Sequence, residues 1–359
     1  MFPDYSFSLG TDRTSYFERH SFFAFGGECY RATLDPCGSI GSRFRRNIHA
    51  HLQMKVVATL STIPSRIDLI RPTIESLLNQ ACPVEKVEVN VPYWCVRTAE
   101  PYKVPDWLTS MDRVEVHRVE DYGAITKVAS TLIRHKDEDV YVWSVDDDFV
   151  YHPDHLATLM SYADGISIVC LHGGIWSQFG FSGGHTRNGN VDVVEGFFGI
   201  VYPPRCIRED FQSYVEKTSA DWDNRKSDDI ILSNYFAIHR VPMKQGRYDP
   251  RKFRVVEAEQ KYGNLPDALK HQDDGHAVRY VRVLNWLKSN GLCGWRDLPQ
   301  INLRQPIRHF GMPMGSSKRP PPFHFLNPEV VYARSKGRSP YGVGSYKKVN
   351  NKPSVETNE

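Results

Sequence analysis

The chain has 359 residues, of which 45 are Lys or Arg and 42 are Asp or Glu, so its formal net charge is only +3. This balance argues against nucleic acid as the partner. The hydrophobic share of 40% is sufficient for a sizeable core. The length suggests one large domain with extensions, or two domains.

The cysteines and the apolar segments indicate the compartment. The seven cysteines are widely spaced and include no C-x-x-C pair. This argues against a zinc ribbon, a thioredoxin-like site and a disulfide framework. No apolar segment follows a basic start, so we predict no signal peptide. No apolar run approaches the roughly 20 residues of a membrane-spanning helix. The sequence therefore predicts a soluble, cytoplasmic protein without a transmembrane segment.

Strand-like and helical periods alternate from residue 54 onward. Strands are predicted by alternating or continuous apolar runs at 54–61, 84–92, 113–119, 140–145, 166–172 and 193–204. Helices are predicted by apolar residues at helical spacing at 70–78, 124–136, 153–163, 227–239 and 276–289. This order predicts an α/β fold with a mainly parallel central sheet flanked by helices.

Changes in composition divide the chain. Residues 1–50 lack a clear period and predict an N-terminal extension to a core at 51–245. Residues 246–314 predict a helical and irregular part that packs on this core. The apolar-poor end, 315–359, predicts a flexible tail. Within the core, the glycine-rich segment 173–190 predicts a long loop of functional importance.

Three consecutive aspartates, Asp146, Asp147 and Asp148, follow the apolar strand predicted at 140–145. In open parallel sheets, ligands bind outside the carboxyl ends of the strands. Because side chains alternate along extended backbone, we expect Asp146 and Asp148 on one side, with Asp147 pointing away. Two converging carboxylates predict a site for Mn²⁺ or Mg²⁺ that leaves positions free for phosphate oxygens. The alternative is that the aspartates only end the strand and cap the next helix.

A second acidic pair, Asp228 and Asp229, follows Ser227 at the start of the helix predicted at 227–239. Ser is a favourable N-cap residue, and carboxylates in the first turn interact well with the helix dipole. From the residues alone, this pair is ordinary chemistry for the start of a helix.

Five segments then carry a resemblance: VVATLSTIPSRI, EDYGAITK, SVDDDFVYHP, VEGFFGIVYPP and SDDIILSNYFA, in this order over residues 56–237. Together they resemble nucleotide-sugar-dependent glycosyltransferases with the Rossmann-like GT-A fold, a group related to the inverting family that includes cellulose-synthase-like enzymes. One departure is Ala124, where relatives often have Pro; this change should cost little. The resemblance implies transfer of a sugar from a nucleotide-diphosphate-sugar to a hydroxyl of a glycan or glycoconjugate, with inversion and with Mn²⁺ or Mg²⁺.

The resemblance also implies roles for individual residues. Asp146 and Asp148 would bind the metal, and Asp229, in preference to Asp228, would be the catalytic base. Glu195 and Gly196 would line the acceptor pocket. Residues matched to the nucleotide-sugar site are Thr62, Pro64, Arg66, Asp121, Tyr122, Gly123, Lys127, Asp146 and Asp147.

Lys127 and Gly123 each have a specific expected role. A third metal ligand is also nominated, from outside the five segments. Lys127 would neutralise phosphate charge, although an ordinary helix lysine is solvated. Gly123 would let the backbone approach the nucleotide. His276 is the further candidate metal ligand, beside the simpler interpretation of an Asp-rich helix start at 271–280.

Two other functions compete with this one. A metal-dependent phosphohydrolase or nuclease would also need clustered aspartates, but no obvious two-metal constellation is present. A non-catalytic module that binds nucleotide-sugars or carbohydrates would keep the fold, but it would have no need of a second acidic pair.

Overall fold

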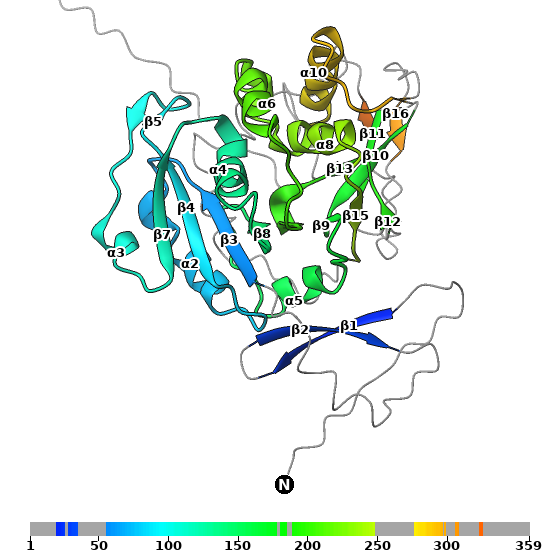
Figure 1. Cartoon of the computed structure of the whole chain (residues 1–359). Coiled ribbons are helices and arrows are strands. Elements are labelled where there is room, and N and C mark those ends of the chain that lie inside the picture. The colour runs from blue at the N-terminus through cyan, green and yellow to red at the C-terminus, as the bar shows by residue number, and fades with distance from the viewer. Residues whose placement is uncertain are drawn as a thin grey trace, which may run out of the picture.

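A computed structural model describes the side chains of residues 55–177, 180–184, 189–247, 279–296 and 298 (Figure 1). For further segments it describes the backbone alone: Arg19–Phe25, Glu28–Leu34, His276–Val278, Pro306–Arg308 and Phe323–Phe325. The predicted tail at 315–359 and most of 246–314 therefore lie outside the described residues.

An eight-stranded sheet forms the centre of the fold. In spatial order its strands are β12 (Gly189–Asn190), β15 (Met243–Gln245), β9 (Ile168–Cys170), β14 (Ile200–Tyr202), β8 (Val140–Ser144), β3 (Lys55–Ser61), β4 (Lys86–Pro92) and β7 (Val114–Val119). Neighbours pair in parallel except at β14 and β12. The predicted mainly parallel sheet is confirmed.

The order of the strands reverses between β3 and β8. From β3 the chain proceeds outward to β4 and β7, and it then returns to place β8 on the other side of β3. In open α/β sheets, a reversal of this kind opens a crevice at the carboxyl ends of the two strands, and ligands bind there. The segment after β3 and the aspartates after β8 both lie at this point.

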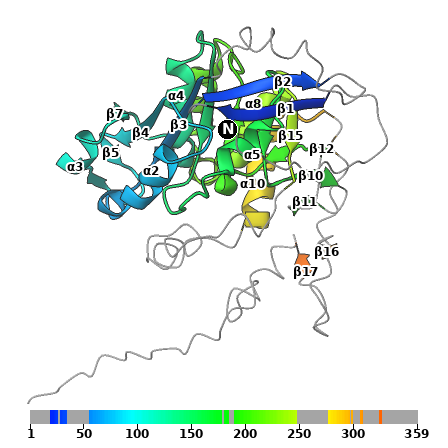
Figure 2. The same ribbon diagram turned by 90° about the horizontal axis from the view of Figure 1, so that it is seen from below.

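Helices cover both faces of the sheet. Figure 2 shows α2 (Arg71–Leu78) and α4 (Thr126–Arg134) on opposite sides of β3 and β4. One apolar cluster contains α2 and α5 (His155–Met160); the other contains α4, α6 (Phe211–Thr218), α8 (Asp228–Ile238) and α10 (His276–Ser289). Strand β8 contributes Trp143 to the first cluster and Val142 to the second. Both its faces are buried, which explains why its sequence is almost continuously apolar.

The prediction of a long loop for the glycine-rich segment at 173–190 is wrong. It contains β10 (Gly173–Ser177) and β11 (Gly180–Gly184), which pair antiparallel, and β10 also pairs with β13 (Val193–Val194). The strand predicted at 193–204 is divided into β13 and β14 by the 3₁₀ turn η4 (Gly196–Phe198). Close contacts with other strands explain two of the glycines, since a Cβ would lie 2.6 Å from the Val193 carbonyl oxygen at Gly173 and 2.4 Å from the Ser182 carbonyl oxygen at Gly174.

The other elements are short. They are β5 (Trp94–Cys95), β6 (Glu100–Pro101), α3 (Asp106–Thr109), α7 (Trp222–Arg225), η2 (Ile67–Leu69) and η3 (Gly123–Ile125). Two further pairs of strands are antiparallel: β1 (Arg19–Phe25) with β2 (Glu28–Leu34), and β16 (Pro306–Arg308) with β17 (Phe323–Phe325). The first pair lies within the predicted N-terminal extension.

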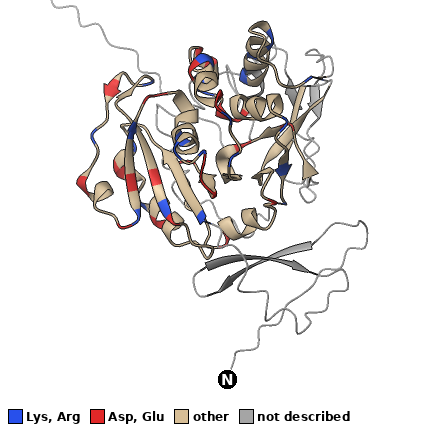
Figure 3. Ribbon diagram, viewed as in Figure 1, with Lys and Arg blue, Asp and Glu red and all other residues tan. Residues whose placement is uncertain are grey.

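Two properties of the described residues bear on partners. None of their helices is both long enough and apolar enough to cross a membrane. Acidic and basic positions are interspersed along the ribbon in the view of Figure 3, in keeping with the small net charge.

Candidate functional site

Lys127 joins the two acidic groups that the sequence presents separately. Its Nζ lies 2.7 Å from Asp146 Oδ1, after β8, and 2.8 Å from Asp228 Oδ2, at the start of α8. Burial alone would lower the pKa of Lys127, but the carboxylates of Asp146, Asp228 and Asp229 outweigh it and raise this pKa well above the usual value. Lys127 is therefore a permanently charged centre between two acids and not a solvated helix lysine.

A second cation, Arg66, faces the other two aspartates. Its Nη1 donates to Asp147 Oδ1 at 3.2 Å and lies 3.6 Å from Asp148 Oδ2. Thr62 Oγ1 donates to Asp147 Oδ2 at 2.6 Å. Asp147 thus has a partner for each carboxylate oxygen, both from the segment after β3. Among the described residues, Arg66 is the cation nearest to Asp148, at this longer distance.

The expected alternation of the three aspartates is wrong. Strand β8 ends at Ser144, and Asp147 and Asp148 lie in a turn. The rule for extended backbone therefore no longer applies beyond Ser144. Asp147 and Asp148 both face Arg66, whereas Asp146 faces Lys127.

The aspartates lie close together in a poorly solvated place. Burial raises the pKa of Asp148 to about 7, and the charges of Asp147 and Asp146 add to this effect. Burial also raises the pKa of Asp147, against the opposing influence of Arg66. This part of the site therefore carries more negative charge than its cations neutralise.

Asp229 begins α8 but has different partners from Asp228. Its Oδ1 accepts from the Gly196 amide at 2.8 Å, and its Oδ2 accepts from the Tyr280 hydroxyl at 2.9 Å. Burial, and then the charge of Asp228, raise the pKa of Asp229 well above the usual value. Ser227 occupies the N-cap position, but its side chain makes no capping hydrogen bond. It donates instead to the Asp223 carbonyl at 2.9 Å.

The predicted acceptor residues border the same place. A Cβ at Gly196 would lie 3.0 Å from Lys127 Nζ, so only glycine fits there without displacing the lysine. Glu195 is buried; its Oε2 lies 2.6 Å from His172 Nδ1 and its Oε1 accepts from Tyr280 at 3.3 Å. The structure therefore brings Lys127, Asp146, Glu195, Gly196, Asp228 and Asp229 into one site.

The DYG segment, Asp121–Gly123, makes a separate group of contacts, and these contacts account for its residues structurally. Asp121 Oδ1 pairs with Arg225 Nη2 at 3.0 Å and accepts from the Gly123 amide at 2.7 Å. Gly123 has φ +81°, and a Cβ there would lie 2.2 Å from the Arg225 carbonyl oxygen. The close backbone that requires this glycine is thus that of Arg225. The Tyr122 amide donates to Thr126 Oγ1, at the start of α4.

The described side chains do not connect two predicted site residues, Pro64 and His276, to the others. Pro64 is half-buried in the turn between β3 and η2, and among the described residues no hydrogen bond or ion pair involves its side chain. His276 is the first residue of α10, but its side chain lies outside the described residues.

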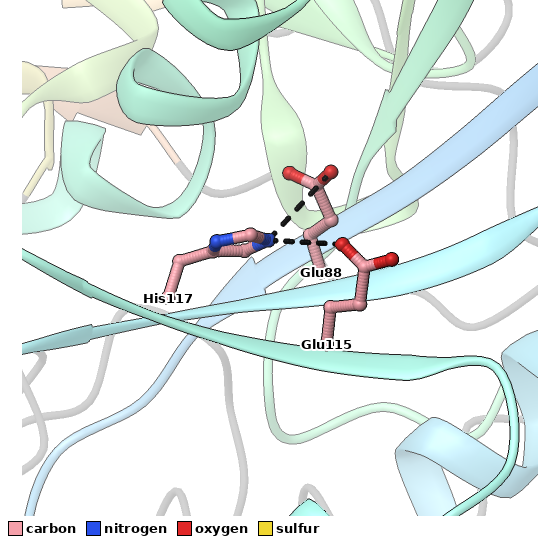
Figure 4. A group of neighbouring side chains, drawn as sticks. All are labelled: Glu88, Glu115 and His117. Atoms are coloured by element: carbon pink, nitrogen blue, oxygen red, sulfur yellow. Dashed lines mark ion pairs between the residues drawn. The ribbon is translucent and has the colours of Figure 1, made fainter.

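A different group of side chains lies close enough to hold a metal ion. Glu88, Glu115 and His117, on β4 and β7, each offer a ligand atom within 4.8 Å of the others (Figure 4). Glu88, however, is already surrounded by cations, with Arg134 Nη2 at 2.5 Å and Lys86 Nζ at 3.1 Å. A metal ion there would have to compete with both.

Two members of the site, His172 and Tyr280, could not be predicted from the sequence. His172 is the last residue of the strand predicted at 166–172 and belongs to no motif. Tyr280 lies 51 positions after Asp229, within a helix whose apolar spacing suggests only packing. Its burial to 1% exposure beside two carboxylates is visible only in three dimensions.

Comparison with known proteins adds little. No family model matches the chain, and no curated protein matches it. A solved structure with some similarity is the apo form of the glycosyltransferase GlyE of Streptococcus pneumoniae TIGR4, at 14% sequence identity and a TM-score of 0.29. The match covers 67% of this chain and 64% of that one, less than two thirds of its length. A likeness this weak supports no conclusion about activity.

Proposed function

We propose that the chain is a metal-dependent glycosyltransferase of the GT-A type. It would transfer a sugar from a nucleotide-diphosphate-sugar to a hydroxyl of a glycan or glycoconjugate. The observation that carries this proposal is the meeting of two acidic groups at Lys127, near the carboxyl ends of β3 and β8, where the strand order reverses. One group is suited to a cation and a diphosphate, and the other to activation of a hydroxyl.

The oxygen donors of Asp146 and Asp148 fit Mn²⁺ or Mg²⁺. The side chain of Asp148 is 21% exposed and lies 3.6 Å from its nearest cation, so an oxygen ligand remains available there. Asp147, by contrast, is already held by Thr62 and Arg66. The bound cation would neutralise the diphosphate leaving group. We assign the nucleotide side of the site to the segment after β3, with Thr62, Pro64 and Arg66, and to Asp121–Gly123.

Asp229 is the proposed base. Asp228 is 7% exposed and paired with Lys127, whereas Asp229 is more exposed and, within the described part of the chain, forms no ion pair. Asp229 would accept the proton of the acceptor hydroxyl as its oxygen attacks the anomeric carbon. A single displacement of this kind inverts the configuration. Lys127 would hold Asp146 and Asp228 on either side of the reacting atoms.

The first test is thermal stability with a panel of nucleoside diphosphates and nucleotide-sugars, each with and without Mn²⁺. A ligand at about 100 times its dissociation constant stabilises the protein by roughly 2.7 kcal/mol, which is easily measured. We expect a metal-dependent shift with one nucleotide class in the native protein. This shift should be lost in Asp148→Asn.

The matched control is His117→Gln, which removes a ligand from the group of Figure 4 and leaves the aspartates intact. It should keep the metal-dependent shift. Loss of the shift in His117→Gln but not in Asp148→Asn would move the metal to β4 and β7 and refute the proposed site.

The second test is turnover. The protein is incubated with the stabilising nucleotide-sugar, radiolabelled in the sugar, and with a panel of glycan acceptors. A labelled glycan is the expected product, and Asp229→Asn should reduce its formation by about 10²- to 10⁴-fold. Hydrolysis of the diphosphate without a labelled glycan would indicate a phosphohydrolase. Binding without turnover would indicate a non-catalytic module.

A further inference from the structure

Two hydrogen bonds of the Tyr280 hydroxyl and one ion-pair contact lead from Asp229 to His172, which is partly exposed. The Tyr280 hydroxyl lies 2.9 Å from Asp229 Oδ2 and 3.3 Å from Glu195 Oε1. On the other side of this carboxylate, Glu195 Oε2 lies 2.6 Å from His172 Nδ1. The His172 side chain is 14% exposed. The four residues come from α8, α10, the end of β13 and the end of β9.

The number of protons in this series is constrained. A tyrosine hydroxyl has one hydrogen, but Tyr280 faces two carboxylate oxygens, and both are acceptors when ionised. Burial and the charge of Asp229 raise the pKa of Tyr280 well above its usual value, so the hydroxyl stays protonated. A second proton, held on Glu195, removes the repulsion between the two carboxylates. The charge of Glu195 is one cause of the raised pKa of Asp229, after burial and the charge of Asp228.

Other charged or titratable groups lie next to the four residues of this series. Asp229 faces Asp228 and Lys127, and the charge of Lys127 opposes the rise in the pKa of Asp229. Glu195 lies near the Cys170 thiol, whose pKa burial raises. Arg279 precedes Tyr280 in the chain, and its charge opposes the rise in the pKa of Tyr280. None of these groups interrupts the contacts from Asp229 to His172.

The position of Tyr280 is fixed by its neighbours on α10. Arg279 Nε donates to Ser227 Oγ at 3.0 Å, and Arg282 Nε donates to Asp223 Oδ2 at 2.6 Å. Both bonds attach α10 to the segment at the start of α8. The Glu195 amide also donates to the His172 carbonyl at 2.9 Å, which holds these two residues together through the backbone. Such support keeps a site within its productive geometry.

We propose that Tyr280 is a positioning residue and that Asp229, Tyr280, Glu195 and His172 form a relay that removes the proton taken from the acceptor hydroxyl. This inference rests on the proposed function, since it uses Asp229 as the base. It adds an exit for the proton that the two acidic motifs do not supply.

Each transfer breaks one bond to hydrogen and forms the next. Protonated Asp229 gives its proton to the Tyr280 oxygen, and Tyr280 gives its own to Glu195 Oε1. Glu195 releases the proton already held on Oε2 to His172 Nδ1, and His172 loses the proton of Nε2 to water. No electrons are exchanged and no co-reactant is needed.

The first experiment does not depend on turnover. The ring nitrogens of His172 are followed by NMR in protein labelled with ¹⁵N-histidine, and they are assigned with His172→Gln. The Asp229→Asn substitution is made in the native background and in Tyr280→Phe. We expect the His172 shifts at pH 7 to respond to Asp229→Asn in the native background only. An equal response in both backgrounds would show a through-space field and overturn the relay.

The second experiment uses the radiolabelled transfer assay. His172→Gly should slow transfer by about 10²-fold, and added imidazole should restore much of the rate, because it replaces the missing ring. Tyr280→Phe should slow transfer and should not respond to imidazole. Failure of imidazole to rescue His172→Gly, with the fold intact, would contradict the exit through His172.

The control is Tyr214→Phe, because Tyr214 also places a buried hydroxyl against α8, donating to the Ile231 carbonyl at 2.8 Å. This variant loses a comparable hydrogen bond outside the relay and should keep both the coupling and the rate. If the NMR coupling is present but no labelled glycan is ever formed, the relay stands and the assigned reaction fails.

Discussion

Two groups of carboxylates in this fold have opposite electrostatic surroundings. Glu88 on β4 is fully buried and lies within 3.1 Å of nitrogen atoms of three residues, Arg134, His135 and Lys86. These contacts outweigh its burial and lower its pKa to about 2. Asp148 after β8 has, within the described part of the chain, one cation partner, Arg66 at 3.6 Å, and its pKa is raised to about 7. The first group is neutralised by the protein, and the second is not.

This difference separates a structural ion network from a candidate site. Both groups look alike as clusters of acidic residues, and the ligand distances favour the one around Glu88. A lowered pKa means that the partners present in the fold stabilise the ionised form of the carboxyl group. A raised pKa means that the fold destabilises the ionised form, which a bound cation would then stabilise. The four predictions below test the contrast.

The largest effect is expected from Glu88→Gln. The substitution leaves Arg134, Lys86 and His135 without their shared counter-charge in a buried place. We expect a loss of about 3–5 kcal/mol in the free energy of unfolding, measured in urea. A loss below about 1 kcal/mol would show that the network contributes no more than an exposed ion pair.

Acid should lower the free energy of unfolding by protonating the same carboxylate, Glu88. The folded-state pKa of Glu88 is about 2, below its ordinary 4.5. Its contribution is therefore complete above pH 4.5 and is lost as the pH falls toward 2. At about 1.4 kcal/mol per pKa unit, this amounts to roughly 3 kcal/mol. Urea unfolding across this range should show the decline in the native protein and a smaller one in Glu88→Gln.

Asp148→Asn should raise the free energy of unfolding, whereas Glu88→Gln should lower it. The pKa of Asp148 is raised in the folded state from 3.8 to about 7, so its contribution to stability is present below pH 3.8 and is lost as the pH rises through 7. At pH 8, without metal, the variant should be more stable than the native protein by about 1–3 kcal/mol, by removal of this carboxylate. No gain at pH 8 would mean that the native site is already neutralised.

The smallest effect is expected from Glu115→Gln. Its side chain is 48% exposed and pairs with Lys86 at 2.7 Å. Exposed pairs of this kind contribute about 0–1 kcal/mol. Thermal unfolding of the variant should differ little from that of the native protein. A loss comparable to that of Glu88→Gln would show that the outer members of the cluster are as important as the buried one.

Much of the fold could be predicted because its signals are local. The apolar runs predicted β3, β4, β7 and β8, and the helical spacing predicted α10 at its observed bounds. The hairpin of β10 and β11 could not be predicted in this way. Glycine has no strand preference, and what requires Gly173 and Gly174 is the close approach of the backbone of neighbouring strands.

The site was predictable in its parts and not in its assembly. Charge and position predicted Asp146 as a functional candidate, and the resemblance nominated Asp228 and Asp229. The link from Asp146 to Asp228 through Lys127 requires α4, β8 and α8 to be packed together. Tyr280 carried no signal, because a tyrosine on the apolar face of a helix has the spacing of a core residue. Its role depends on the carboxylates opposite its hydroxyl, and these are distant in sequence.

Strand β14 has a consequence for folding. It lies between β8 and β9, although both precede it in the chain, and it runs antiparallel to both. A nascent chain that ends before residue 200 therefore exposes two open strand edges, which are templates for aggregation. Fragments that stop there should not fold stably, and the turn carrying Gly196 is positioned only when this last central strand inserts. Closure of the sheet and formation of the site are thus one cooperative event.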